Sequence, residues 1–104
     1  MKKITSGIAV FLSFAGQGVH AQDVPNLLQT NACTACHQAT TRTVGPAWKE
    51  IADRYRDGSK TAVQLSESIK NGGAGAWGQV PMPPQAQLSE ADRISIAKWI
   101  LTSN

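Results

Sequence analysis

Apolar side chains recur at helical spacing in four stretches of the chain. In one of them, Trp48, Ile51 and Tyr55 follow one another at intervals of three and four residues, which places them on one face of a helix. The expected helices lie within residues 23–37, 45–59, 59–73 and 89–101. The pattern therefore predicts an all-α fold of four short helices joined by long connections.

Residues that start or stop helices frame these stretches. Asp23 is expected as the N-cap of the first helix, and Pro46 in the first turn of the second. Ser89 opens a near match to a capping box before the last helix. Gly58 and Gly72 are expected to end the second and third helices, because glycine readily adopts the backbone conformation that closes a helix.

The glycine-rich stretch 73–78 matches the G-x-G-x-x-G pattern of dinucleotide-binding loops, but its context does not. That pattern normally follows a strand and opens a helix. Here no strand alternation precedes it, and Pro81, Pro83 and Pro84 follow where the helix should begin. We therefore expect a loop that binds no dinucleotide.

Residues 1–21 have the pattern of a secretory signal peptide. The basic head Met1-Lys2-Lys3 precedes the apolar run 7–16, which is too short to span a bilayer. Val19 and Ala21 occupy the −3 and −1 positions of a cleavage site. We therefore expect export, cleavage after Ala21, no membrane anchor after cleavage, and a mature domain of residues 22–104.

Charge is sparse in two segments of this mature domain. Loss of Lys2 and Lys3 lowers the number of Lys and Arg from 10 to 8, against 7 Asp and Glu. No cluster of basic residues remains, which argues against nucleic acid as a partner. Residues 24–41 and 71–89 contain no Asp, Glu, Lys or Arg at all. The first of these segments contains both cysteines, and the second contains Met82.

The stretch CTACH places Cys33, Cys36 and His37 within five residues. A thioredoxin-like pair of thiols would need a βαβ setting, which the pattern lacks, and a structural zinc site would need a fourth ligand. Cys-x-x-Cys-His is the attachment signature of c-type haem. The two thiols would form thioethers with the haem vinyl groups, and His37 would face the iron. We therefore expect one covalently bound haem c.

Met82 is the candidate for the second axial ligand. It is the only methionine in residues 22–104, and Pro81, Pro83 and Pro84 stiffen the backbone around it. Methionines more commonly fill gaps in a core. A methionine that only fills a gap in the core rarely needs so stiff a backbone. The expected mature chain also contains no second histidine that could bind the iron instead. A thioether ligand would raise the reduction potential and fill the last coordination site of the iron.

Five motifs, in order, resemble the short periplasmic class I mono-haem cytochromes c of bacteria. These motifs are CTACH, VGPAW, IKNGGAGAWG, PMPP and AKWIL, and they span nearly all of the mature chain. The resemblance implies four short helices packed around one covalently attached haem, with the first and last helices crossing. It also implies a periplasmic location.

The resemblance assigns further residues to the haem site. It implies that the Pro46 carbonyl accepts a hydrogen bond from His37 and so fixes the ligand's tautomer. It implies that the Trp77 indole contacts a haem propionate. Trp48, Tyr55 and Trp99 are expected in the core. Relatives often carry a basic residue in place of Ser68 and an asparagine in place of Gln85, which leaves the reduction potential open.

The function that this resemblance implies is one-electron transfer by Fe(III)/Fe(II) cycling between larger redox proteins of a respiratory chain, with no catalysis by the chain itself. The alternative is a dedicated haem subunit of a periplasmic dehydrogenase or oxidoreductase complex. In the first case we expect a monomer. Its donor and acceptor would dock at the exposed haem edge, near Ala35, Val44, Val80 and Pro83.

Overall fold

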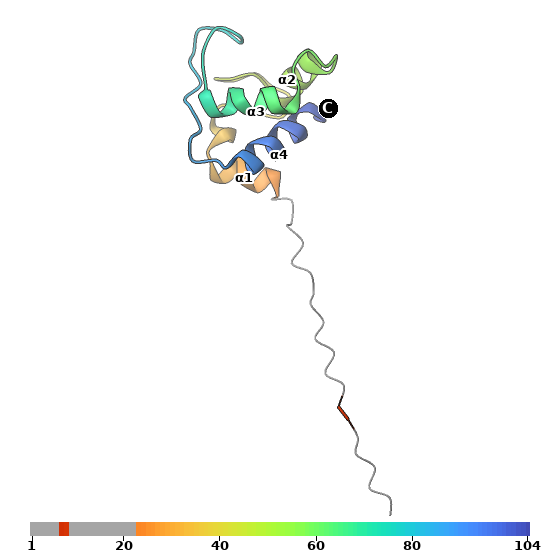
Figure 1. Ribbon diagram of the computed structural model, residues 1–104. Helices are drawn as coiled ribbons and strands as arrows, with labels where there is room; N and C mark the ends of the chain where they lie inside the picture. The colour runs from red at the N-terminus through yellow and green to blue at the C-terminus, as the bar shows by residue number, and fades with distance from the viewer. Residues whose placement is uncertain (1–6, 9–22) are drawn as a thin grey trace, which may run out of the picture.

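The computed structural model describes residues 7, 8 and 23–104 (Figure 1). The secondary structure of this part consists of four α-helices and one short 3₁₀ turn: α1 Val24–Thr30, η1 Cys33–Ala35, α2 Trp48–Tyr55, α3 Ala62–Asn71 and α4 Glu90–Leu101. The predicted all-α class and the long connections are confirmed. The predicted signal peptide, residues 1–21, lies almost entirely outside the described residues.

The first helix is shorter than the pattern predicts. It was expected within 23–37, but α1 ends at Thr30. The Asn31 side-chain amide donates to the Leu27 carbonyl at 2.8 Å, and Ala32 then takes a left-handed conformation with φ of 58°. This bend turns the chain, so that Cys33 begins a separate 3₁₀ turn.

The second helix begins later than predicted. Pro46 was expected in its first turn, but α2 starts at Trp48 with Ala47 as the N-cap. The Glu50 carboxylate accepts the Ala47 N–H at 3.1 Å and caps this end. Pro46 lies just outside the helix, which leaves its carbonyl free for a side chain. Gly58 was expected to end this helix, but α2 ends at Tyr55 with Arg56 as the C-cap. Gly58, with φ of 84°, lies in the turn two residues beyond that cap.

The ends of the last two helices agree with the sequence. Thr61 and Gln64 form a reciprocal capping box, in which each side-chain oxygen accepts the other residue's backbone N–H. Gly72 follows the end of α3 with φ of 62°, and its N–H donates to the carbonyl of Ser68. At the start of α4, the Ser89 hydroxyl accepts a backbone N–H of the first turn.

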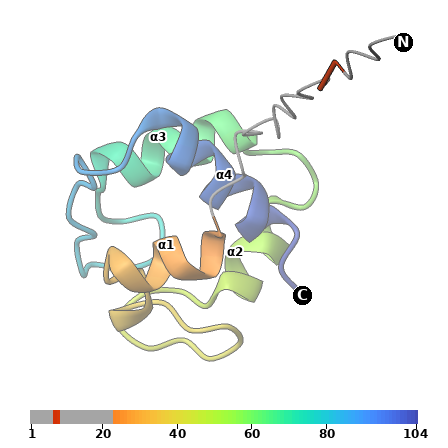
Figure 2. The ribbon, with the colours of Figure 1, turned by 90° about the horizontal axis from the view of Figure 1, so that it is seen from below.

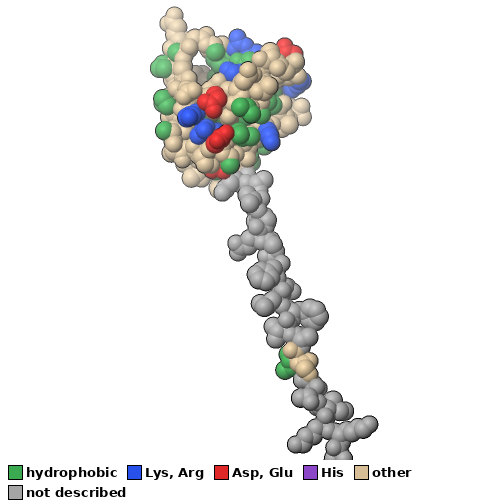
Figure 3. Space-filling view, in the orientation of Figure 1, with side chains coloured by type: hydrophobic (Ala, Val, Ile, Leu, Met, Phe, Trp, Pro, Cys, Tyr) green, Lys and Arg blue, Asp and Glu red, His purple; other side chains and the backbone are tan. Residues whose placement is uncertain are grey.

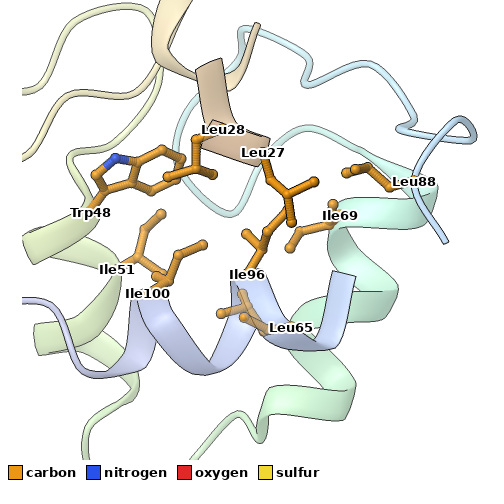
Figure 4. Close-up of a cluster of buried hydrophobic side chains, with 10 residues drawn as sticks. Leu27, Leu28, Trp48, Ile51, Leu65, Ile69, Leu88, Ile96 and Ile100 are labelled. Atoms are coloured by element: carbon orange, nitrogen blue, oxygen red, sulfur yellow. The ribbon is translucent and has the colours of Figure 1, made fainter. Parts of the chain in front are cut away.

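Helix α4 is the centre of the packing, because it contacts α1, α2 and α3 (Figures 1 and 2). The first and last helices therefore meet, as the resemblance implies. Their shared core (Figure 4) consists of Leu27, Leu28, Trp48, Ile51, Leu65, Ile69, Leu88, Ile96, Ala97 and Ile100. Each large apolar side chain that is fully buried contributes about 1.5–3 kcal/mol.

The three aromatic residues predicted for the core lie in it or beside it. Trp48 is buried, and the half-buried Tyr55 and Trp99 pack against the cluster. Within residues 7–8 and 23–104, no helix has both the length and the apolar character that a membrane span requires.

Candidate functional site

His37 lies in a cradle made by the chain that follows it. Its Nδ1 lies 2.7 Å from the Pro46 carbonyl oxygen, which can only accept, so Nδ1 carries the proton. The Trp48 ring stacks on the imidazole with centroids 4.5 Å apart and planes 22° apart. A Cβ on Gly45 would lie 2.8 Å from His37 Cε1. The ring is therefore held on several sides, and its Nε2 keeps a free lone pair for a metal.

The two cysteines lie on the turn directly before this imidazole. Both thiols are free and half-buried. The backbone N–H groups of Cys36 and His37 both donate to the Cys33 carbonyl, at 3.2 and 3.0 Å. Burial raises the pKa of the Cys33 thiol, so the thiol is neutral near pH 7. The turn thus presents two unpaired thiols and one oriented imidazole together.

Met82 is held by its backbone. Its N–H donates to the Gly73 carbonyl at 2.8 Å, and the Gly73 N–H donates to the Met82 carbonyl at 3.0 Å. A Cβ on Gly72 would overlap the Met82 carbonyl oxygen. The Gln85 amide donates to Pro83 O at 2.9 Å and so turns toward the backbone of this segment. Within the described chain, no hydrogen bond joins Met82 to the CTACH turn.

Trp77 lies on the same connection between α3 and α4. The Tyr55 ring meets it edge to face, with centroids 6.2 Å apart. The guanidinium carbons of Arg54 and Arg42 lie 4.3 and 5.8 Å from the Trp77 ring centroid. The sequence did not point to these two arginines, because they lie far from Trp77 along the chain. The stacking of Trp48 on His37 was also missed, since helical periodicity assigns Trp48 only to the core.

The donor set fits a covalently attached haem. Two free thiols precede an imidazole whose outer nitrogen is available, which is the arrangement that Cys-x-x-Cys-His provides. In the described part of the chain, His, Cys, Asp and Glu side chains nowhere gather in a group of three that could hold a bare metal ion.

Comparisons with known proteins agree with this chemistry. The family model "Cytochrome c" matches residues 21–104. Cytochrome c-552 of Nitrosomonas europaea is 48% identical over 83 residues, which cover 80% of this chain and 81% of the relative. Cytochrome c-551 of Pseudomonas aeruginosa is 40% identical over 86 residues, with 83% and 82% covered.

A longer match and a solved structure extend these similarities. Cytochrome c-551 of Stutzerimonas stutzeri is 40% identical over 103 residues, which cover 98% of each chain. The crystal structure of wild-type Nitrosomonas europaea cytochrome c552 is similar with a TM-score of 0.73 and 48% identity, over 77% of this chain and 99% of that one. The chain belongs to the cytochrome c family: it is a class I mono-haem cytochrome c that binds one haem c covalently and carries electrons.

Proposed function

We propose that the chain is a free periplasmic carrier which passes single electrons between larger redox proteins of a respiratory chain. In this proposal the signal peptide is cleaved after Ala21, the mature protein is a monomer without a membrane anchor, and it performs no catalysis of its own. A c-551 matches over 98% of each chain, so that relative carries a similar segment before residue 22, which supports the proposal.

We assign the haem site to six residues. Cys33 and Cys36 form the thioethers, and His37 and Met82 are the axial ligands. Pro46 fixes the imidazole, and Trp77 contacts a propionate. The bound haem supplies one-electron chemistry, while the protein supplies ligands, burial and a surface for its partners. The observation that carries the assignment is the 2.7 Å contact from His37 Nδ1 to the Pro46 carbonyl.

A protein ligand on each side of the iron supports electron transfer rather than catalysis. Oxygen or peroxide activation needs an open coordination position. Met82 lies in a segment stiffened by prolines and paired with Gly73, which suits a ligand that must return to one place. With both axial positions filled, the iron has no open position for a substrate, and electron exchange is the function that remains.

The proposed docking edge consists of exposed, uncharged residues. Ala35 and Pro83 are exposed, and Val44 and Val80 are 57% and 63% exposed. On the face seen in Figure 3, the Lys and Arg side chains are mixed with Asp and Glu and do not form one large basic field. These features favour partners that bury a small apolar patch over partners drawn by long-range charge.

The proposal is tested on protein purified from the native compartment. The intact mass should equal residues 22–104 plus one haem, and size exclusion should give a monomer. Elution as part of a large complex would instead favour the dedicated haem subunit. The ferric protein should show the thioether-to-iron absorption band near the red end of the spectrum. Met82→Ala should abolish that band and lower the reduction potential; if both survive, another group holds the iron.

A further inference from the structure

Two guanidinium groups converge on Trp77 from different parts of the fold. Arg54 comes from the last turn of α2, and its Nη1 donates to the Ala76 carbonyl at 2.6 Å. Arg42 comes from the connection before α2, and its Nη1 donates to the Trp77 carbonyl at 3.3 Å. Both also face the indole ring, at the distances given above, which are within the range of cation–π contacts.

The segment that they hold has little structure of its own. In Figure 1 it forms the arch between α3 and α4, coloured teal to blue. Most of residues 73–81 are exposed, and the tip is a turn in which the Gly75 N–H donates to the Gly78 carbonyl at 2.7 Å. Positive φ angles occur at Gly73, Gly75 and Gly78. A glycine-rich loop is entropically costly to order, so contacts from outside must fix it.

Arg54 makes no ion pair within residues 23–104, and its guanidinium carbon also lies 5.8 Å from the Tyr55 ring centroid. Within residues 23–104, the ion pairs join Arg42 to Glu50, Lys49 to Asp53 and Arg56 to Asp53. Arg54 takes part in none of them, although Lys49 and Arg56, which precede and follow it in the chain, both pair with Asp53. Its guanidinium is instead directed at the Ala76 carbonyl and the Trp77 ring. Arg42, by contrast, is anchored at 3.4 Å to Glu50, the residue that caps α2.

We propose that Arg54, assisted by Arg42, is a clamp which keeps the Met82 segment closed. Gly73 and Met82 pair through their backbones, and this pair closes the base of the loop that contains Trp77. Loss of the arginine contacts loosens the outer part of the loop. Met82 is then tied by this pair and by the Gln85 N–H, which donates to the Ile69 and Lys70 carbonyls at 3.2 Å. Met82 then leaves the iron more often. The inference rests on the proposed axial role of Met82.

The test compares three variants of the ferric holoprotein: Arg54→Gln, Arg54→Lys and the control Arg56→Gln. The control removes the same charge from an exposed arginine that is paired with Asp53 and does not contact Trp77. The probe is cyanide, which binds the iron only when Met82 has left. We expect Arg54→Gln to bind cyanide about tenfold faster than the wild type. This factor corresponds to the free energy lost with one cation–π contact and one charge-assisted hydrogen bond.

The two other variants separate the clamp from a simple charge effect. Arg56→Gln should bind cyanide at the wild-type rate. Arg54→Lys should bind cyanide at a rate between those of the wild type and Arg54→Gln. The lysine ammonium keeps the charge but lacks the planar guanidinium group that contacts the Trp77 ring and the Ala76 carbonyl together. A wild-type rate in Arg54→Gln, or equal acceleration in Arg54→Gln and Arg56→Gln, overturns the proposal.

Amide hydrogen exchange distinguishes this proposal from the ligand assignment. In Arg54→Gln, exchange should accelerate in residues 73–82 and stay unchanged in the helix α4. Equal acceleration in both places would mean general destabilisation and would refute a clamp. A wild-type ferric protein without the thioether band would disprove Met82 ligation. In that case, faster exchange confined to 73–82 would still support the arginine clamp on the loop, and unchanged exchange would refute it.

Discussion

Gly72 is the position at which a single methyl group should disturb the Met82 segment most. It follows α3 with φ of 62° and ψ of −158°, a backbone conformation that is essentially restricted to glycine. A Cβ there would overlap the Met82 carbonyl oxygen and would lie 2.8 Å from both Pro83 C and Pro84 N. These neighbours are backbone atoms of a proline-rich segment, so they cannot rotate away as a side chain would.

The expected loss of stability in Gly72→Ala has two parts. The backbone strain costs about 1–3 kcal/mol. Displacement of the packed segment adds about 1–3 kcal/mol, as overpacking does elsewhere. Gly58→Ala is the matched control, because Gly58 has φ of 84° but a Cβ there would meet nothing within 4 Å. Gly58→Ala should lower the free energy of unfolding only by the cost of a left-handed residue, about 1–2 kcal/mol.

The assay is unfolding of the ferric holoprotein in guanidinium chloride, followed both by circular dichroism and by the thioether absorption band. In Gly72→Ala the band should disappear at a lower denaturant concentration than the helical signal, because the Met82 segment is displaced first. In Gly58→Ala the two signals should shift together. If both variants lose the same stability and keep coincident transitions, the close approach between Gly72 and Met82 has no energetic importance.

Three further changes test other contacts. Gly45→Ala should push His37 out of its cradle, since the new Cβ would lie 2.8 Å from the imidazole Cε1, and the ferric electron paramagnetic resonance spectrum should shift. Thr61→Ala removes the cap of α3 and should cost about 1 kcal/mol in a denaturant titration. Val80→Glu should slow electron transfer to the physiological partner more than Lys49→Glu. A steep salt dependence of that rate would instead indicate electrostatic docking.

The helices could be predicted from the sequence because their signals are local. Two of the predicted ends, at Gly72 and Ser89, depend only on residues within a few positions of each other, and the structure confirms them. The haem attachment residues were accessible for the same reason, since Cys33 to His37 form one contiguous motif. Local backbone preferences and a short motif can be recognised in the sequence without knowledge of the fold.

The remaining features depend on what the side chains meet after folding. The break after Thr30 comes from the amide of Asn31 and the left-handed Ala32, neither of which interrupts the apolar period. The contacts of Arg42 and Arg54 with Trp77 join residues 35 and 23 positions apart, so no local pattern encodes them. Such contacts follow from the packing of α2 beside the 73–82 loop.

The two proposed iron ligands are held in physically different ways, which determines their order of release. His37 is bounded by Pro46 and by Trp48, which is only 6% exposed and belongs to the helical core. Its orientation can be lost only when that core opens. Met82 is tied by a backbone pair at the base of a glycine-rich loop, and most residues of that loop are exposed. Local opening concentrates in segments of this kind, so the Met82 side of the site should open while the His37 side stays folded.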